Sequence, residues 1–94
     1  MARIVWSRVA RDDLGAIVSY IRADSPGYAR SFGLRVRQRV TRLEAFPESG
    51  RLVPEDPTNT YRELILGNYR VIYRYERDTV TIVTIIHGMR TLRL

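Results

Sequence analysis

The chain has 94 residues, enough for one domain with one modest hydrophobic core. It contains no cysteine, which excludes disulfides and thiolate metal sites, and no apolar stretch reaches the length of a membrane span. All 16 basic residues are arginine and the net charge is +6, which favours nucleic acid or an acidic protein as a partner. The alternative is a solvated arginine-rich surface without a specific partner.

The N-terminal half is predicted to form one strand followed by two helices. The β-prone run 2–6 precedes Ser7, a residue type that caps helices. The stretch "DSPGY" ends the first helix, and Ser25 followed by Pro26 is typical of the start of a second one. In the first helix, apolar residues recur at the i, i+3, i+4, i+7 spacing of one face: Leu14, Ile17, Val18 and Ile21.

The second helix is predicted to run to about Phe46. Its apolar stripe consists of Ala29, Phe32, Val36, Val40 and Leu43. Leu34 lies away from this stripe, and Arg30 and Arg37 lie on one flank of it. An exposed leucine beside arginines is what a protein-binding helix presents, although single exposed leucines are also common without any function.

The C-terminal half is predicted to form a long loop followed by three strands. The loop, 46–60, contains three prolines and is longer than a simple connection needs. The tight turns between the strands make them antiparallel. The last strand is apolar on both faces, which predicts an interior position. The expected strands are 61–66, 69–76 and 79–88.

These elements predict an α+β fold in a single domain, 1–94. The order is an N-terminal strand, a two-helix hairpin and a three-stranded antiparallel meander, with the helices packed on one face of a small sheet. The expected core consists of Leu14, Ile17, Phe32, Val36, Val40, Val71 and Ile82.

Alternation along the expected strand 69–76 places Arg70 and Arg74 on the face that the helices leave open. Arg62 can join them if the register of the hairpin permits. With Arg90, these arginines are the candidate residues for binding a phosphate or a target. The alternative is a solvated face on which arginine stems cover apolar surface.

A second candidate site is catalytic. Metal-free RNA cleavage needs a base, an acid and a cation that stabilises the charged phosphorus centre. Arg70 can supply the cation, His87 the acid or base, and Glu55 the base if the proline loop folds over the sheet. The sequence does not show that they converge, and a lone histidine at a strand end is also explained by structure alone. No catalytic residue is therefore favoured.

The stretch "FPESGRLVPE", followed by "YRELILGNYRVIYRYERDTVTIVTIIHGMR", resembles the RelE/ParE superfamily of bacterial toxins, and the match covers nearly the whole chain. The resemblance implies a toxin of a type II toxin–antitoxin module, linked to growth arrest and plasmid stabilisation. It also implies a hetero-oligomer with an acidic antitoxin, for which Arg30, Leu34 and Arg37 are the candidate contacts. The RelE branch cuts messenger RNA in the ribosomal A site, whereas the ParE branch inhibits DNA gyrase.

Two features favour the ParE branch. The chain has no lysine, and no tyrosine follows Tyr75. The expected function is therefore inhibition of DNA gyrase without enzymatic activity. The alternative is a RelE-like, ribosome-dependent and metal-independent mRNA endoribonuclease that uses Glu55, Arg70 and His87. We expect no cofactor, no metal and no membrane partner. We also expect a cytoplasmic location, because the N-terminus lacks the apolar stretch of a signal peptide.

Overall fold

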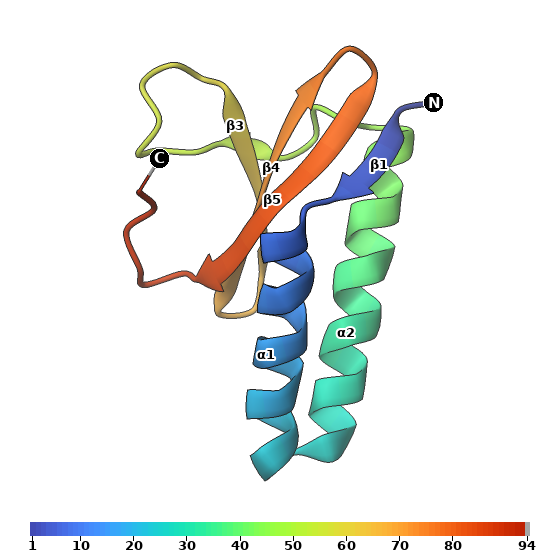
Figure 1. Ribbon diagram of the computed structural model, residues 1–94, viewed down its shortest axis with the longest axis vertical. Helices are drawn as coiled ribbons and strands as arrows, with labels where there is room; N and C mark the ends of the chain where they lie inside the picture. The colour runs from blue at the N-terminus through green and yellow to red at the C-terminus, as the bar shows by residue number, and fades with distance from the viewer. Residues whose placement is uncertain (94) are drawn as a thin grey trace.

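A five-stranded sheet carries a helical hairpin on one face (Figure 1). The computed structural model describes residues 1–93. The strand order is β1-β5-β4-β3-β2, and only the β1–β5 pair is parallel. This arrangement confirms the predicted α+β fold. Its elements are β1 (Arg3–Trp6), α1 (Arg8–Asp24), α2 (Pro26–Thr41), a 3-10 turn η1 (Arg42–Glu44), β2 (Arg51–Leu52), β3 (Tyr61–Leu66), β4 (Tyr69–Glu76) and β5 (Thr79–His87).

The helix boundaries follow the local sequence, with one correction. Ser7 caps α1, since its Oγ accepts a hydrogen bond from the backbone N–H of Ala10 (3.0 Å). Pro26 opens α2 as predicted, but the Ser25 side chain makes no capping hydrogen bond. The predicted end of α2 near Phe46 is too late, because the chain tightens into η1 after Thr41. Pro47 also disfavours helical geometry in the residue before it.

The core lies between the helical hairpin and the sheet. Phe32, Val36 and Val40 of α2 are buried there against β3, β4 and β5. The predicted core residues Phe32, Val36, Val40, Val71 and Ile82 are all buried. Leu14 and Ile17 are only partly buried, and they pack against the edge of this cluster. Within residues 1–93, neither helix has the length and apolar character that a membrane span requires.

The last strand, β5, lies between β1 and β4, so its predicted interior position is confirmed. Its pairing with β4 is irregular at one point, where Val83 has no partner in the register. Two side chains of the N-terminal half bond to the backbone there. Ser7 Oγ donates to the Val83 carbonyl (2.8 Å), and Asp13 Oδ2 accepts from the N–H of Ile85 (3.0 Å). The start of α1 is thereby fastened to an interior strand of the sheet.

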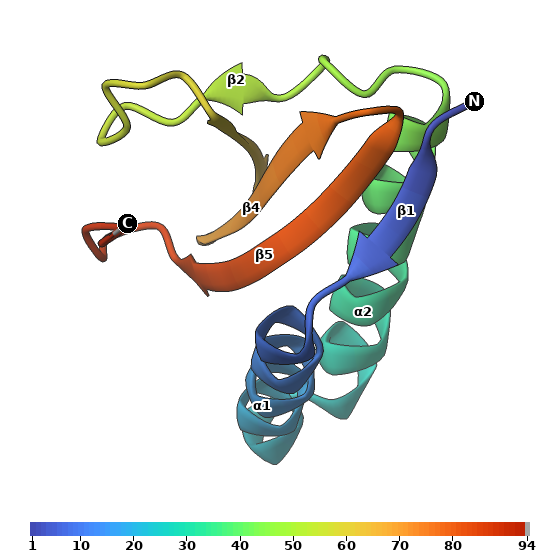
Figure 2. The same cartoon turned by 45° about the horizontal axis from the view of Figure 1, so that its top comes forward.

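The sheet face opposite the helices, which alternation alone predicts to be open, is partly covered. The loop between β2 and β3 and the C-terminal segment after β5 both lie on this side (Figures 1 and 2). Ile72 points to this face, yet it is completely buried, and Val53 of the loop is also buried. These apolar side chains give the loop a surface on which to pack.

The start of the long loop is held by one tyrosine of β4. The Tyr73 hydroxyl donates to the carbonyl of Pro47 (2.9 Å) and accepts from the N–H of Gly50 (2.9 Å). The approach is so close that a Cβ on Gly50 would lie 2.6 Å from the Tyr73 oxygen. The loop therefore leaves the helices in a fixed direction.

We expect Tyr73→Phe to lower the free energy of unfolding by about 1–3 kcal/mol, because the buried N–H of Gly50 and the partly buried carbonyl of Pro47 lose their partner. Tyr75→Phe is the matched control, since the Tyr75 hydroxyl bonds to the exposed Asp78. Its effect should stay below about 0.5 kcal/mol. Urea denaturation measures both, and equal effects would show that the Tyr73 hydroxyl does not hold the loop.

Candidate functional site

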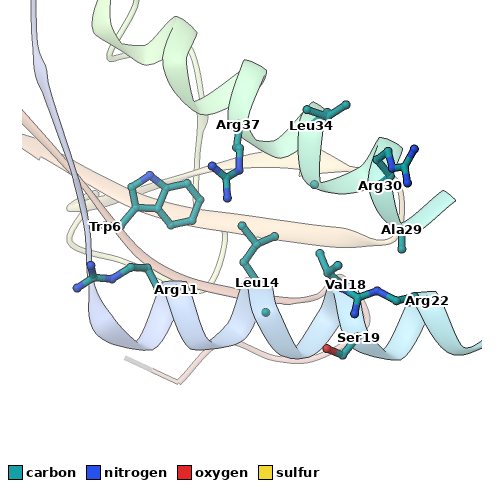
Figure 3. A pocket seen from close by; sticks show the side chains of 12 residues that line it. Trp6, Arg11, Leu14, Val18, Ser19, Arg22, Ala29, Arg30, Leu34 and Arg37 are labelled. Carbon is teal, nitrogen blue, oxygen red and sulfur yellow. The ribbon is translucent and has the colours of Figure 1, made fainter. Parts of the chain in front are cut away.

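A hollow of about 720 Å³ lies between the two helices (Figure 3). We call it the α1–α2 groove. Its apolar lining includes Trp6, Leu14 and Val18. Two of its lining residues are glycines, Gly15 and Gly33, and the absence of their side chains keeps it open. Four arginines border it: Arg11, Arg22, Arg30 and Arg37.

The three residues predicted to contact an antitoxin come together in this groove. Arg30, Leu34 and Arg37 all line it, and Leu34 is 55% exposed. Figure 3 shows Leu34 on α2 with Arg30 and Arg37 on either side of it along the helix. An apolar lining with a cationic border suits an amphipathic segment that carries carboxylates.

The second cluster centres on Arg70, which points away from the helices and is only 6% exposed. Its Nε donates to Glu63 Oε1 (2.6 Å). Its two terminal nitrogens donate to the two carboxylate oxygens of Glu55 (2.8 and 2.7 Å). Arg51 lies on the far side, where its Nε donates to Glu63 Oε2 (2.5 Å). We call Arg51, Glu55, Glu63 and Arg70 the Arg70 cluster.

Glu63 was not among the residues expected from the sequence. Its side chain is fully buried between two guanidinium groups. A buried carboxylate needs such pairing, because desolvation of an isolated charge is costly. The sequence carries a signal for it, since the stretch "YRELIL" places one acidic residue directly before the apolar end of the strand. The register places Glu63 opposite Ile72, two residues along β4 from Arg70.

Glu55 reaches Arg70 because the loop around it is ordered by its neighbour. Asp56 accepts hydrogen bonds from the backbone N–H groups of Thr58, Thr60 and Tyr61 (2.9, 2.8 and 2.9 Å). The pKa of Asp56 is lowered, chiefly by the hydroxyl of Thr58. The sequence "DPTNT" is typical of such an aspartate-centred turn, although the sequence alone did not assign it this role.

The contacts of Glu55 change its acidity. Hydrogen bonds from Arg70, and then from the backbone N–H of Leu92, lower the pKa of Glu55 from 4.5 to about 2. The pKa of Arg70 is raised, chiefly by its bonds to Glu55. Glu55 therefore stays ionised at neutral pH and has little tendency to take up a proton.

His87 approaches the cluster without joining it. The register pairs His87 with Tyr69, and their rings pack edge to face with centroids 5.5 Å apart. Its Nδ1 accepts a hydrogen bond from the N–H of Met89 (3.1 Å). His87, Glu55 and Arg70 border one hollow of about 440 Å³. Because Tyr69 and Arg70 alternate along β4, the histidine and the guanidinium point to opposite faces of the sheet.

The arginines expected to bind a phosphate or a target do not form one patch. The register pairs Arg62 with Tyr73, which places it on the helix side of the sheet, away from Arg70. There it donates to the carbonyls of Glu48 (3.1 Å) and Gly50 (2.8 Å). Arg74 shares the face of Arg70 and is exposed. Arg90 is exposed too, and its carbonyl accepts from Arg70 (3.1 Å).

Within residues 1–93, no group of three histidine, aspartate or glutamate side chains is arranged to hold a metal ion. The α1–α2 groove combines arginines with apolar side chains, and the Arg70 cluster pairs arginines with carboxylates.

Comparison with known families identifies the fold's relatives. The family model for the ParE toxin of the parDE type II toxin–antitoxin system matches residues 4–92. The chain belongs to this family. The predicted resemblance to the RelE/ParE superfamily is thereby confirmed.

The relatives of this ParE-family toxin carry names from both branches. A Caulobacter vibrioides protein named Toxin RelE2 is 41% identical over 91 residues, covering 96% of this chain and 99% of that protein. The toxin is also similar in structure to the chromosomal ParDE system of P. aeruginosa, with a TM-score of 0.78, 24% identity, and 93% and 96% of the two chains covered. A RelBE2 toxin–antitoxin complex from Mycobacterium tuberculosis gives a TM-score of 0.52 at 20% identity, with 92% and 90% covered. Both structural likenesses concern the fold.

In this ParE-family toxin, we expect Arg70→Met to lower the free energy of unfolding by about 3–5 kcal/mol, because Glu63 stays buried with one partner fewer. Arg74→Met is the matched control on the same strand and face, with an expected effect below about 0.5 kcal/mol. Neutralising both carboxylates in the Arg70→Met background, with Glu55→Gln and Glu63→Gln, should recover part of the loss. Chemical denaturation measures all of these variants. A mild effect of Arg70→Met would mean that the cluster contributes little to stability.

Proposed function

We propose that this ParE-family toxin acts by binding DNA gyrase and does not cut RNA. The observation that supports this is the state of the Arg70 cluster. Arg70 is held between two carboxylates, so its charge is already neutralised and is not free to stabilise a phosphorus centre. Glu55, with a pKa of about 2, is a poor base at neutral pH.

Family membership supports the same proposal. The match is to the ParE toxin model, and the ParE branch is the one that the resemblance links to gyrase. The second candidate is ribosome-dependent mRNA cleavage, which the name of the Caulobacter relative favours. One geometric observation also favours it, since Glu55, Arg70 and His87 border a common hollow. The two candidates differ in whether a proton must be transferred.

Replacement of His87 separates these candidates. Under the gyrase proposal, His87→Ala should remain toxic on expression, and the purified wild-type toxin should block DNA supercoiling by gyrase. Under mRNA cleavage, loss of a general acid or base lowers the rate by roughly 10²–10⁴-fold, so His87→Ala should no longer arrest growth. Circular dichroism controls for folding. A folded, non-toxic variant, together with a gyrase that the wild-type toxin does not inhibit, would contradict the gyrase proposal.

We also propose that an acidic antitoxin neutralises the toxin by occupying the α1–α2 groove in a hetero-oligomer. The titles of the similar structures name a ParDE system and a RelBE2 toxin–antitoxin complex. In this chain the four arginines at the groove and the net charge of +6 favour a partner with carboxylates. The exposed Leu34 offers an apolar contact at the centre of that surface.

We expect Leu34→Glu to weaken binding of the cognate antitoxin by roughly 10–100-fold, because a charge replaces a central apolar contact. Tyr20→Glu is the matched control, since Tyr20 is 74% exposed on α1 and does not line the groove. Isothermal titration calorimetry measures both affinities. Equal losses in the two variants would exclude the groove as the binding site.

A further inference from the structure

The C-terminal segment, residues 88–93, is attached to the Arg70 cluster through its backbone. The N–H of Leu92 donates to Glu55 Oε2 (2.8 Å), and the carbonyl of Arg90 accepts from Arg70 (3.1 Å). Each bond joins a backbone group to a charged side chain, which makes it stronger than a bond between neutral groups. A segment that follows the last strand is thus held at two points.

The held segment forms one wall of a further hollow, of about 600 Å³. Four consecutive tail residues, 90–93, line it, and Ile72, Val83 and Ile86 line it from the sheet. Leu92 is partly buried, whereas Arg90 and Arg93 are exposed. The tail therefore combines one partly buried apolar side chain with two exposed cationic side chains. It lies on the side of the sheet away from the helices (Figure 2).

The Arg70 cluster is arranged to reach this tail. Glu55 uses one oxygen for Arg70 alone and shares the other between Arg70 and Leu92. The position of Arg70 is itself fixed by its hydrogen bond to the buried Glu63. A buried ion pair often contributes little to stability compared with apolar residues of the same size. It does provide directed hydrogen bonds, and here those bonds end on the tail.

We propose that Glu55 and Arg70 are positioning residues that clamp segment 88–93 over the sheet, so that Arg90 and Arg93 present a surface to an acidic segment of the target protein. The identity of that target as gyrase rests on the proposed function. The acidic character follows from charge complementarity, because the charged residues among those that line the hollow, Arg90 and Arg93, are both cationic.

The first test follows the Leu92 amide. In Glu55→Gln, hydrogen exchange at the Leu92 N–H, measured by NMR, should accelerate by roughly 10–100-fold, because a charged acceptor is lost. The Ile85 N–H, in the interior strand β5, bonds to Asp13 Oδ2 and to no group of the Arg70 cluster, so it should keep its rate. Glu48→Gln is the matched control, since the exposed Glu48 lies 3.7 Å from Arg62 and does not touch the tail. Unchanged exchange at Leu92 in Glu55→Gln would overturn the clamp.

The second test asks whether the clamped tail binds the target. Glu55→Gln should weaken inhibition of gyrase supercoiling by roughly tenfold, as should truncation after Gly88, and combining the two should cost no more than truncation alone. If Glu55→Gln acted only by disturbing the fold, its loss of inhibition would add to the loss caused by truncation. The variant carrying Arg90→Glu and Arg93→Glu leaves the clamp bonds in place, so it should lose inhibition while exchange at Leu92 stays slow.

Full inhibition of gyrase by that double variant, or by a Glu55→Gln toxin with a freed tail, would overturn the proposal that the tail contacts the target. A wild-type toxin that does not inhibit gyrase would contradict the proposed function instead. In that case growth arrest by the same variants replaces supercoiling as the readout, and the exchange at Leu92 still tests the clamp.

Discussion

The hydrogen bonds of the Arg70 guanidinium group hold together the sheet face opposite the helices in this toxin. This group joins β4 to β3 through Glu63, to the proline-containing loop through Glu55, and to the C-terminal segment through the carbonyl of Arg90. A charge that is only 6% exposed must be paired, so the loop cannot adopt a path that removes Glu55 without a large energetic cost. This requirement helps to determine the path of the loop over that face of the sheet.

The same arrangement bears on the choice between two activities. A free arginine, a carboxylate and a histidine would form a plausible set for RNA cleavage if each could exchange protons or bind phosphate. In this chain Arg70 and Glu55 bond to each other, and the His87 ring packs against Tyr69 on the neighbouring strand. Residue types that would suit catalysis therefore serve as structural contacts, which is why their presence in a sequence does not define an active site.

The predictions from sequence that are confirmed rest on local patterns. The α2 stripe, the alternation in β4 and the two tight turns each depend on residues within a few positions, and together they predicted the fold and most of the core. The missed features depend on distant segments. The position of Arg62 required the register of β3 on β4, and the burial of Ile72 required the path of the loop. The pairing of Arg70 with both Glu55 and Glu63 required the strand register and the path of the loop together, so no periodic pattern could reveal it.

The irregular point in β5 has a consequence for how the chain is made. Ser7 and Asp13 bond there to the backbone of Val83 and Ile85, more than 70 positions later in the chain, and β1 pairs with the same strand. The helical hairpin can form from local contacts, but the interior strand β5 that it packs on is the last of the described strands to be synthesised. A nascent chain lacking β5 has neither the strand that joins β1 to β4 nor the backbone groups that anchor the start of α1. The sheet and its contacts with α1 can therefore assemble only after β5 has been synthesised.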